Sequence, residues 1–164
     1  MRLLYLILLA SFGSHAAERY APAEDIRAAM DAYSRAANLQ PLKASGEDEL
    51  RLWARGYMSG RIDGYVFSKY AALNCQASSS YAEDIVTIER ARCRRWSKGE
   101  DTLDALGALS ALDGKQWDCP LFDGVAIYVE GVSAGRRFAF RVSNPSACDD
   151  LDSKAVLDLL AKLR

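Results

Sequence analysis

The chain has 164 residues, of which 50% are hydrophobic and 26% are charged, and its net charge is −1. This balance excludes the strongly basic surface that general nucleic-acid binding or a polybasic membrane patch requires. The length suits one globular domain with one core, and the hydrophobic content excludes a disordered chain.

The first sixteen residues have the layout of a secretory signal peptide. Arg2 gives a basic start, residues 3–12 are apolar, and Ser14 and Ala16 are the small residues that precede a cleavage site. The apolar run is too short to span a bilayer, which needs about 20 residues. Cleavage after Ala16 leaves one domain, 17–164, which we expect to be periplasmic or secreted and without stable membrane insertion.

The mature part begins with a predicted helix over residues 23–38. Its apolar residues, among them Ile26, Met30 and Tyr33, recur at three-to-four spacing, which is typical of an amphipathic helix. Pro22 and the acidic residues that follow it suit a helix start.

Residues 50–69 fit either a helix or a β-hairpin. Gly56, Gly60 and Gly64 stand four apart, and three interior glycines would cost a helix about 3 kcal/mol relative to alanine. A hairpin with residues 58–60 as its loop and Gly60 in the left-handed conformation is the better interpretation. We therefore predict the hairpin.

One register of this hairpin separates an apolar face from an aromatic and charged face. Arg55 then lies opposite Asp63, and Trp53 lies opposite Tyr65, both favourable cross-strand pairs. The second face collects a candidate binding surface: Trp53, Arg55, Tyr57, Asp63, Tyr65 and Phe67. Exposed, such a mixture is typical of a protein-binding hot spot. Alternatively, helix 23–38 covers this face and makes it a second core layer.

Residues 80–98 are also ambiguous. Ser80 and Glu83 resemble the capping box of a helix, whereas the β-branched residues at 85–88 favour a strand. We predict a strand over 84–92.

Two helices are predicted on either side of a second hairpin. Residues 101–112 repeat leucine every three residues and stop before Gly114, which suits a helix end. Residues 152–163 place Val156 and Leu160 on one apolar stripe, behind acidic residues at the favourable helix pole.

The second hairpin is predicted over residues 124–143, with 132–135 as a four-residue loop. Apolar and polar residues alternate strictly in both strands, so one face is apolar. In this register Ile127 lies opposite Phe140, and Val129 lies opposite Phe138. We expect that face to rest on the core.

Four cysteines lie in the mature part, and an even count in an exported chain predicts two disulfides. Three connectivities are open. Cys119 and Cys148 are symmetrical about the turn of the second hairpin, which favours the pairs 119–148 and 75–93. The alternatives are four free thiols or a zinc site, but no cysteine pair has the close spacing of a zinc motif.

The C-terminal part carries a set of short motifs: Trp117-Asp118-Cys119, Asp123-Gly124, Glu130-Gly131, Gly-Arg-Arg-Phe-Ala-Phe at 135–140, Asn144-Pro145 and Cys148. Through them, residues 100–164 resemble small exported proteins of Gram-negative bacteria that have no known activity. The resemblance implies export and an α+β domain, and it supplies no catalytic residue. A shorter likeness, to periplasmic immunity proteins directed against amidase effectors, is confined to the glycine-rich run 56–64.

Cleavage of the signal peptide takes away His15, the only histidine of the chain. Ser-His and Cys-His nucleophilic sites are then excluded, and we expect no cofactor and no metal. The nearest catalytic set is Asp118, Asp123 and Glu130, because paired carboxylates need no histidine. The opposing interpretation is that Asp123 begins a strand and Glu130 pairs with Arg137.

The predicted fold is α+β: an antiparallel sheet with two hairpins, three helices and two disulfides. The predicted function is that of an exported, non-catalytic binding protein, such as an inhibitor or immunity-type protein, that recognises another protein. The alternatives are a carboxylate-dependent hydrolase acting on cell-envelope polymers and a structural envelope component.

Overall fold

A computed structural model describes residues 17–20, 26–44, 46–83, 85–97, 100–121 and 124–163. The predicted signal peptide, the start of the first predicted helix and Asp123 lie outside these ranges. In chain order the elements are β1 (Glu18–Tyr20), α1 (Ile26–Ala36), β2 (Glu49–Gly56), β3 (Arg61–Ser68), β4 (Ala72–Ala82), β5 (Ile85–Ile88), β6 (Arg92–Arg95), the 3-10 helix η1 (Glu100–Ala105), α2 (Leu106–Ser110), β7 (Gln116–Asp118), β8 (Val125–Ser133), β9 (Arg136–Ser143), the 3-10 helix η2 (Pro145–Ala147) and α3 (Leu151–Lys162).

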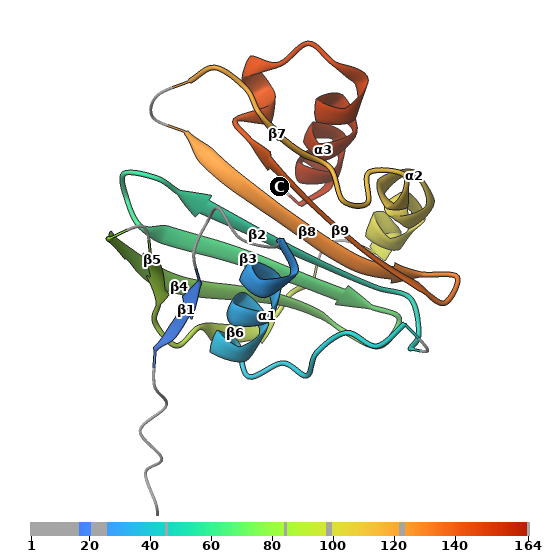
Figure 1. Cartoon of the computed structure of the whole chain (residues 1–164). Coiled ribbons are helices and arrows are strands. Elements are labelled where there is room, and N and C mark those ends of the chain that lie inside the picture. The colour runs from blue at the N-terminus through green and yellow to red at the C-terminus, as the bar shows by residue number, and fades with distance from the viewer. Residues whose placement is uncertain are drawn as a thin grey trace, which may run out of the picture.

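The strands form one nine-stranded sheet in the order β1-β5-β4-β3-β2-β8-β9-β7, with β6 also paired to β4 (Figure 1). All neighbours are antiparallel except β7 and β9, which are parallel. The α+β fold is confirmed, but the sheet is mixed, and the expectation of a purely antiparallel sheet is wrong. A connection that includes β8 separates β7 from its partner, which allows the parallel pairing.

Helices cover both faces of the sheet. On one face, α1 packs on the central strands through residues such as Met30 and Tyr33. On the other face, η1, α2 and α3 pack on the same strands through residues such as Leu109 and Leu159. Central strands covered on both faces bury most of their residues, as β2 and β8 do.

The helices agree with the predicted segments, with adjusted bounds. The segment 101–112 forms η1 and α2 in succession instead of one continuous helix. Helix α3 begins at Leu151 because the side chain of Asp150 accepts a hydrogen bond from the Ser153 amide at 2.7 Å and caps the helix. None of the described helices is long and apolar enough to span a membrane.

The segment 50–69 is a hairpin, but its register differs from the prediction by one residue. Trp53 lies opposite Gly64, and Arg55 lies opposite Ile62. Gly60 has the expected positive φ, 62°, but the loop contains four residues, 57–60. Side-chain packing explains the register, because a Cβ at Gly64 would lie 2.2 Å from the Trp53 ring. The slip turns the side chains of β3 to the opposite face from the one predicted.

Strand β4 has no counterpart among the predicted elements. It runs through Ala72–Ala82, where serines, an asparagine and a glutamine obscure the strand pattern. It pairs with β3 along one side and with both β5 and β6 along the other. The single strand predicted over 84–92 is therefore wrong, since β5 ends at Ile88 and β6 begins at Arg92.

The second hairpin is confirmed, with its register displaced by two residues. Val129 lies opposite Phe140, and the strands join through Ala134 and Gly135, whose φ values are 49° and 74°. These two positive values make a tight two-residue turn that matches the twist of the strands. A shift of two residues preserves the faces, so the predicted apolar face, including Ile127, is buried.

Both favoured disulfides are confirmed. Cys75–Cys93 joins residues that are paired directly across β4 and β6. Cys119–Cys148 forms for a different reason from the one predicted, since the symmetry about the turn relied on the wrong register. The amide of Cys119 bonds to the carbonyl of Ser143 beside the parallel strand pair, and η2 returns Cys148 to it. Two disulfides indicate an oxidising compartment.

Candidate functional site

The six residues of the candidate binding surface do not share one face. Trp53 and Arg55 of β2 point toward α1, whereas Tyr65 and Phe67 of β3 point toward α2 and α3, on the same side as Asp63. The cause is the one-residue difference in register. Trp53 and Phe67 are 1% and 2% exposed, so both belong to the core.

Helix α1 covers Trp53, as the alternative interpretation of this face expected. The indole stacks on the Tyr33 ring with 5.5 Å between centroids and an angle of 12°. Tyr128 of β8 completes the cluster, 5.3 Å from Tyr33. Of the six predicted residues, Tyr57 is the one whose aromatic ring is clearly exposed, at 39%.

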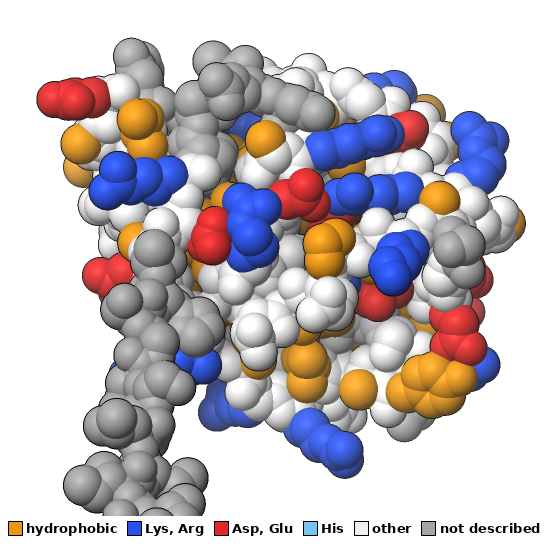
Figure 2. Space-filling view, turned by 60° about the horizontal axis from the view of Figure 1, so that its bottom comes forward, with side chains coloured by type: hydrophobic (Ala, Val, Ile, Leu, Met, Phe, Trp, Pro, Cys, Tyr) orange, Lys and Arg blue, Asp and Glu red, His pale blue; other side chains and the backbone are white. Residues whose placement is uncertain are grey.

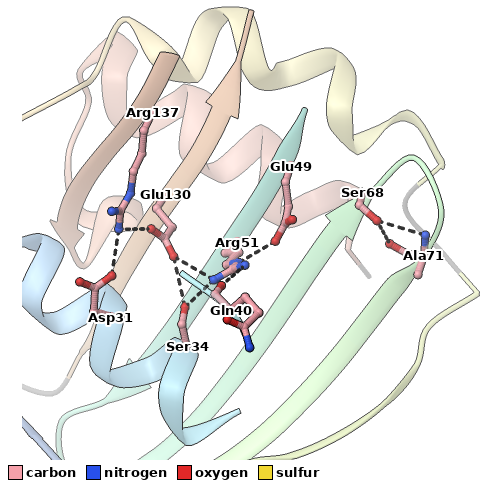
Figure 3. Close-up of polar contacts among 9 residues, drawn as sticks. All are labelled: Asp31, Ser34, Gln40, Glu49, Arg51, Ser68, Ala71, Glu130 and Arg137. Atoms are coloured by element: carbon pink, nitrogen blue, oxygen red, sulfur yellow. Dashed lines mark hydrogen bonds and ion pairs between the residues drawn. The ribbon is translucent and has the colours of Figure 1, made fainter. Parts of the chain in front are cut away.

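A buried ionic network joins α1 to three strands (Figure 3). Its centre is Glu130 of β8, which is 0% exposed. One carboxylate oxygen accepts a hydrogen bond from Arg137 at 2.9 Å, and the other lies 3.6 Å from Arg51 and accepts from Ser34 at 3.2 Å. Arg137 also reaches Asp31 of α1 at 3.0 Å.

The Arg51 guanidinium donates hydrogen bonds to three partners in this network. It donates to Glu49 at 2.6 Å, to the Ser34 hydroxyl at 2.8 Å and to the Gln40 carbonyl at 2.8 Å. The side chain is 4% exposed, so these bonds replace those that water would make. The network fixes α1 and the segment after it on the sheet, and it engages both oxygens of Glu130.

The carboxylates of the alternative hydrolase hypothesis lie far apart. Asp118 is level with Ser143 of β9, while Glu130 is level with Ala139. Four residues along a strand span about 13 Å, which exceeds the separation of paired catalytic carboxylates. Asp118 and Glu130 therefore form no such pair.

Burial raises the pKa of Glu130 above its ordinary value of 4.5, and attraction by Arg51 and Arg137 offsets part of the rise. The pKa of this carboxyl group is higher in the folded protein than in the unfolded chain, so its protonated form favours folding. This contribution to the free energy of unfolding is fully present below pH 4.5 and is lost as the pH rises through the pKa of the folded state. The glutamine side chain of the Glu130→Gln variant does not titrate, so the variant does not lose this contribution as the pH rises. We therefore expect the stability of this variant to improve relative to wild type between pH 4 and pH 7, measured by urea denaturation. A constant difference across this range would contradict the prediction.

A second polar cluster lies on the same face of the sheet as α1. Nη2 of Arg141 lies 2.9 Å from the Tyr57 hydroxyl, 2.7 Å from the Ser143 hydroxyl and 2.9 Å from the Asp118 carboxylate. Arg55 of β2 lies over the Tyr57 ring, with its Cζ 5.2 Å from the centroid. Two arginines, a phenol and a hydroxyl thus converge near the β2–β3 loop.

Sequence reasoning found Arg55 and Tyr57 but missed Arg141 and Ser143. The signal was present, since Arg141 falls on the polar face of the second hairpin. What brings it to Tyr57 is the pairing of β2 with β8, which joins residues far apart in the chain. No local pattern encodes that pairing.

Exposed apolar side chains lie beside this cluster, in the β2–β3 loop and shortly before β8. The amide of Tyr57 bonds to the Gly124 carbonyl, so the β2–β3 loop lies beside the residue that precedes β8. The Asn144 side chain donates to the Leu121 carbonyl, and Cys119–Cys148 ties the start of α3 to the same region. We define the loop-end surface as Tyr57, Met58 and Leu121, which are 39%, 82% and 55% exposed.

One group of residues among those described has the spacing of metal ligands: Cys119, Cys148 and Asp150. The two thiols are consumed in a disulfide, and the carboxylate caps α3. These residues therefore do not fit a metal site.

No protein-family model matches the sequence, and a search of the curated proteins gives no match.

Proposed function

We propose that this chain is an exported, non-catalytic protein that binds another protein, in the manner of an inhibitor or immunity-type protein, through the loop-end surface. The observation that carries the proposal is the exposure of Tyr57 and Met58 in the β2–β3 loop, and of Leu121 shortly before β8, beside an arginine–tyrosine cluster. Apolar anchors with arginine and tyrosine are the composition of interface hot spots.

The exposed apolar side chains of the loop-end surface lie in the β2–β3 loop and shortly before β8. In the view of Figure 2, from below that of Figure 1, basic and acidic side chains are interspersed and hydrophobic side chains form small separate patches. Such a face suits contact with solvent. Grouped apolar side chains at one end of a sheet are a better candidate for an interface, because burying them gains free energy.

Export is supported by two independent features. The leader-like first sixteen residues predict secretion, and the two disulfides fit the oxidising compartment that secretion reaches. A protein partner would then be sought in the cell envelope or outside the cell.

The test captures envelope proteins of the source organism on immobilised domain 17–164 and then measures the affinity of each purified candidate. We expect Met58→Asp and Leu121→Asp to weaken binding at least tenfold, because each places a charge against a desolvated apolar contact.

The matched control is Tyr70→Asp, which places the same charge on an aromatic residue that is 74% exposed. Tyr70 follows β3 and lies at the opposite end of the sheet from the loop-end surface. Its affinity should equal that of wild type. Capture of no protein, or equal affinity for all three variants, would refute the proposal.

A further inference from the structure

Arg55 is a buried cation without an ionic partner in the described part of the chain. The residue is 5% exposed, and its Nε has no hydrogen-bond partner. Its one described interaction of a polar kind is the contact with the Tyr57 ring. Arg51, on the same face of β2, shows the contrast, because two carboxylates surround it. The Nη atoms of Arg55 are not among the buried atoms without a partner, so they reach the surface, where an anion can pair with the guanidinium.

Arg141 is a second arginine whose Nε is buried and has no hydrogen-bond partner among the described residues. Its side chain is 14% exposed. Arg55, Ala126 and Ser143 lie level across β2, β8 and β9, so Arg55 stands two strands, about 10 Å, from Ser143, and Arg141 lies two residues further along β9. The Tyr57 side chain bridges this gap, with Arg55 over its ring and Arg141 at its hydroxyl.

The charges of the cluster specify the ligand. Arg55 and Arg141 carry two positive charges, and Asp118, which is 66% exposed, supplies one negative charge to Arg141. One positive charge remains, and it lies on the more buried arginine. A single carboxylate would neutralise it, whereas a phosphate dianion would leave an excess of negative charge. The planar guanidinium fork also matches the two oxygens of a carboxylate.

We propose that Arg55, Arg141 and the Tyr57 hydroxyl form a binding site for one carboxylate group, supplied by an acidic side chain or the C-terminus of the protein partner. The site lies beside the loop-end surface, because Tyr57 belongs to both. The origin of the carboxylate rests on the proposed function, whereas the existence of the site does not.

The probe for the site is acetate, titrated into the ¹⁵N-labelled domain at constant ionic strength with chloride as the balancing anion. We expect the Arg55 and Arg141 Nε–Hε signals to shift with saturation in the millimolar range, as suits a ligand of four heavy atoms. Inorganic phosphate should bind more weakly. Non-saturating shifts shared by all exposed arginines, or tighter binding of phosphate, would overturn the carboxylate site.

Substitutions at Arg55 test whether acetate binding depends on this residue. Arg55→Met should abolish saturable acetate binding, and it should raise the Tm in chloride because an unpaired buried charge is removed. Arg55→Lys keeps the charge but loses the fork, so it should weaken acetate at least threefold, and it serves if the methionine variant fails to fold. Arg61→Met, which removes an exposed arginine paired with Asp63, should bind acetate like wild type. Acetate binding that survives both Arg55 substitutions would refute the assignment.

A final comparison separates the site from the proposed function. If Arg55→Met loses acetate and also binds the purified partner at least tenfold more weakly, the carboxylate comes from the partner. If it loses acetate but binds the partner normally, the site takes a small free carboxylate and its assignment to the partner is wrong. If acetate binds and no partner is captured, the proposed function fails and the site remains.

Discussion

Replacing Arg51 with methionine should lower the free energy of unfolding by about 3–5 kcal/mol, because it leaves Glu130 buried with one of its two arginines missing. Glu130 is completely buried, and Arg51 donates to three groups that anchor α1, β2 and the segment after α1. Chemical denaturation at pH 7 measures the loss.

The double variant Arg51→Met/Glu130→Met tests why Arg51→Met is less stable. The cause is either the unpaired charge left on Glu130 or the loss of the Arg51 side chain itself. Replacing both members of a buried pair with apolar groups is often neutral, so the double variant should be more stable than Arg51→Met alone. Arg61→Met is the matched control, since its ion pair with Asp63 is exposed and its removal should leave stability unchanged. A double variant less stable than Arg51→Met would show that the charge on Glu130 is not what destabilises the single variant.

Trp53→Ala should lower the free energy of unfolding by about 3–5 kcal/mol, because the indole fills the space between Tyr33 and the backbone of Gly64. The structure thereby changes the meaning of a binding test at Trp53. Loss of binding in this variant would report an altered core, not a missing contact. Thermal or urea unfolding of the variant checks the expectation.

Met58→Ala is the matched control for the core substitution. Met58 is 82% exposed in the β2–β3 loop, so its truncation should change stability by less than about 0.5 kcal/mol. A loss of stability as large as that of Trp53→Ala would mean that the loop packs against the domain. A Trp53→Ala variant as stable as wild type would contradict the core position of the indole.

Short-range patterns predicted the elements well where one face of an element is apolar. The alternation around Ile127 and Val129 identified the second hairpin and its buried face, although the register moved by two residues. The face survived because strand side chains alternate with a period of two. The same rule made the one-residue error in the first hairpin more serious, since it divided Trp53 and Tyr65 between opposite faces.

The candidate site was predictable only in part. Arg55 and Tyr57 stand in one strand and the loop that follows, so the local pattern brings them together. Arg141 and Asp118 join them because β8 lies between β2 and β9 and because β7 runs parallel to β9. Pairings at such sequence separation leave no periodic signal in either strand.

The sequence by itself determined the helical segments, the two hairpins and the buried face of the second hairpin. These features follow from local periodicity and composition, which act within a few residues. Only the tertiary structure decided that α1 covers Trp53, that two arginines meet at Tyr57 and that the loop-end surface forms. Those outcomes depend on strand register and on which face each helix covers, and both are set by the packing of side chains that are distant in the chain.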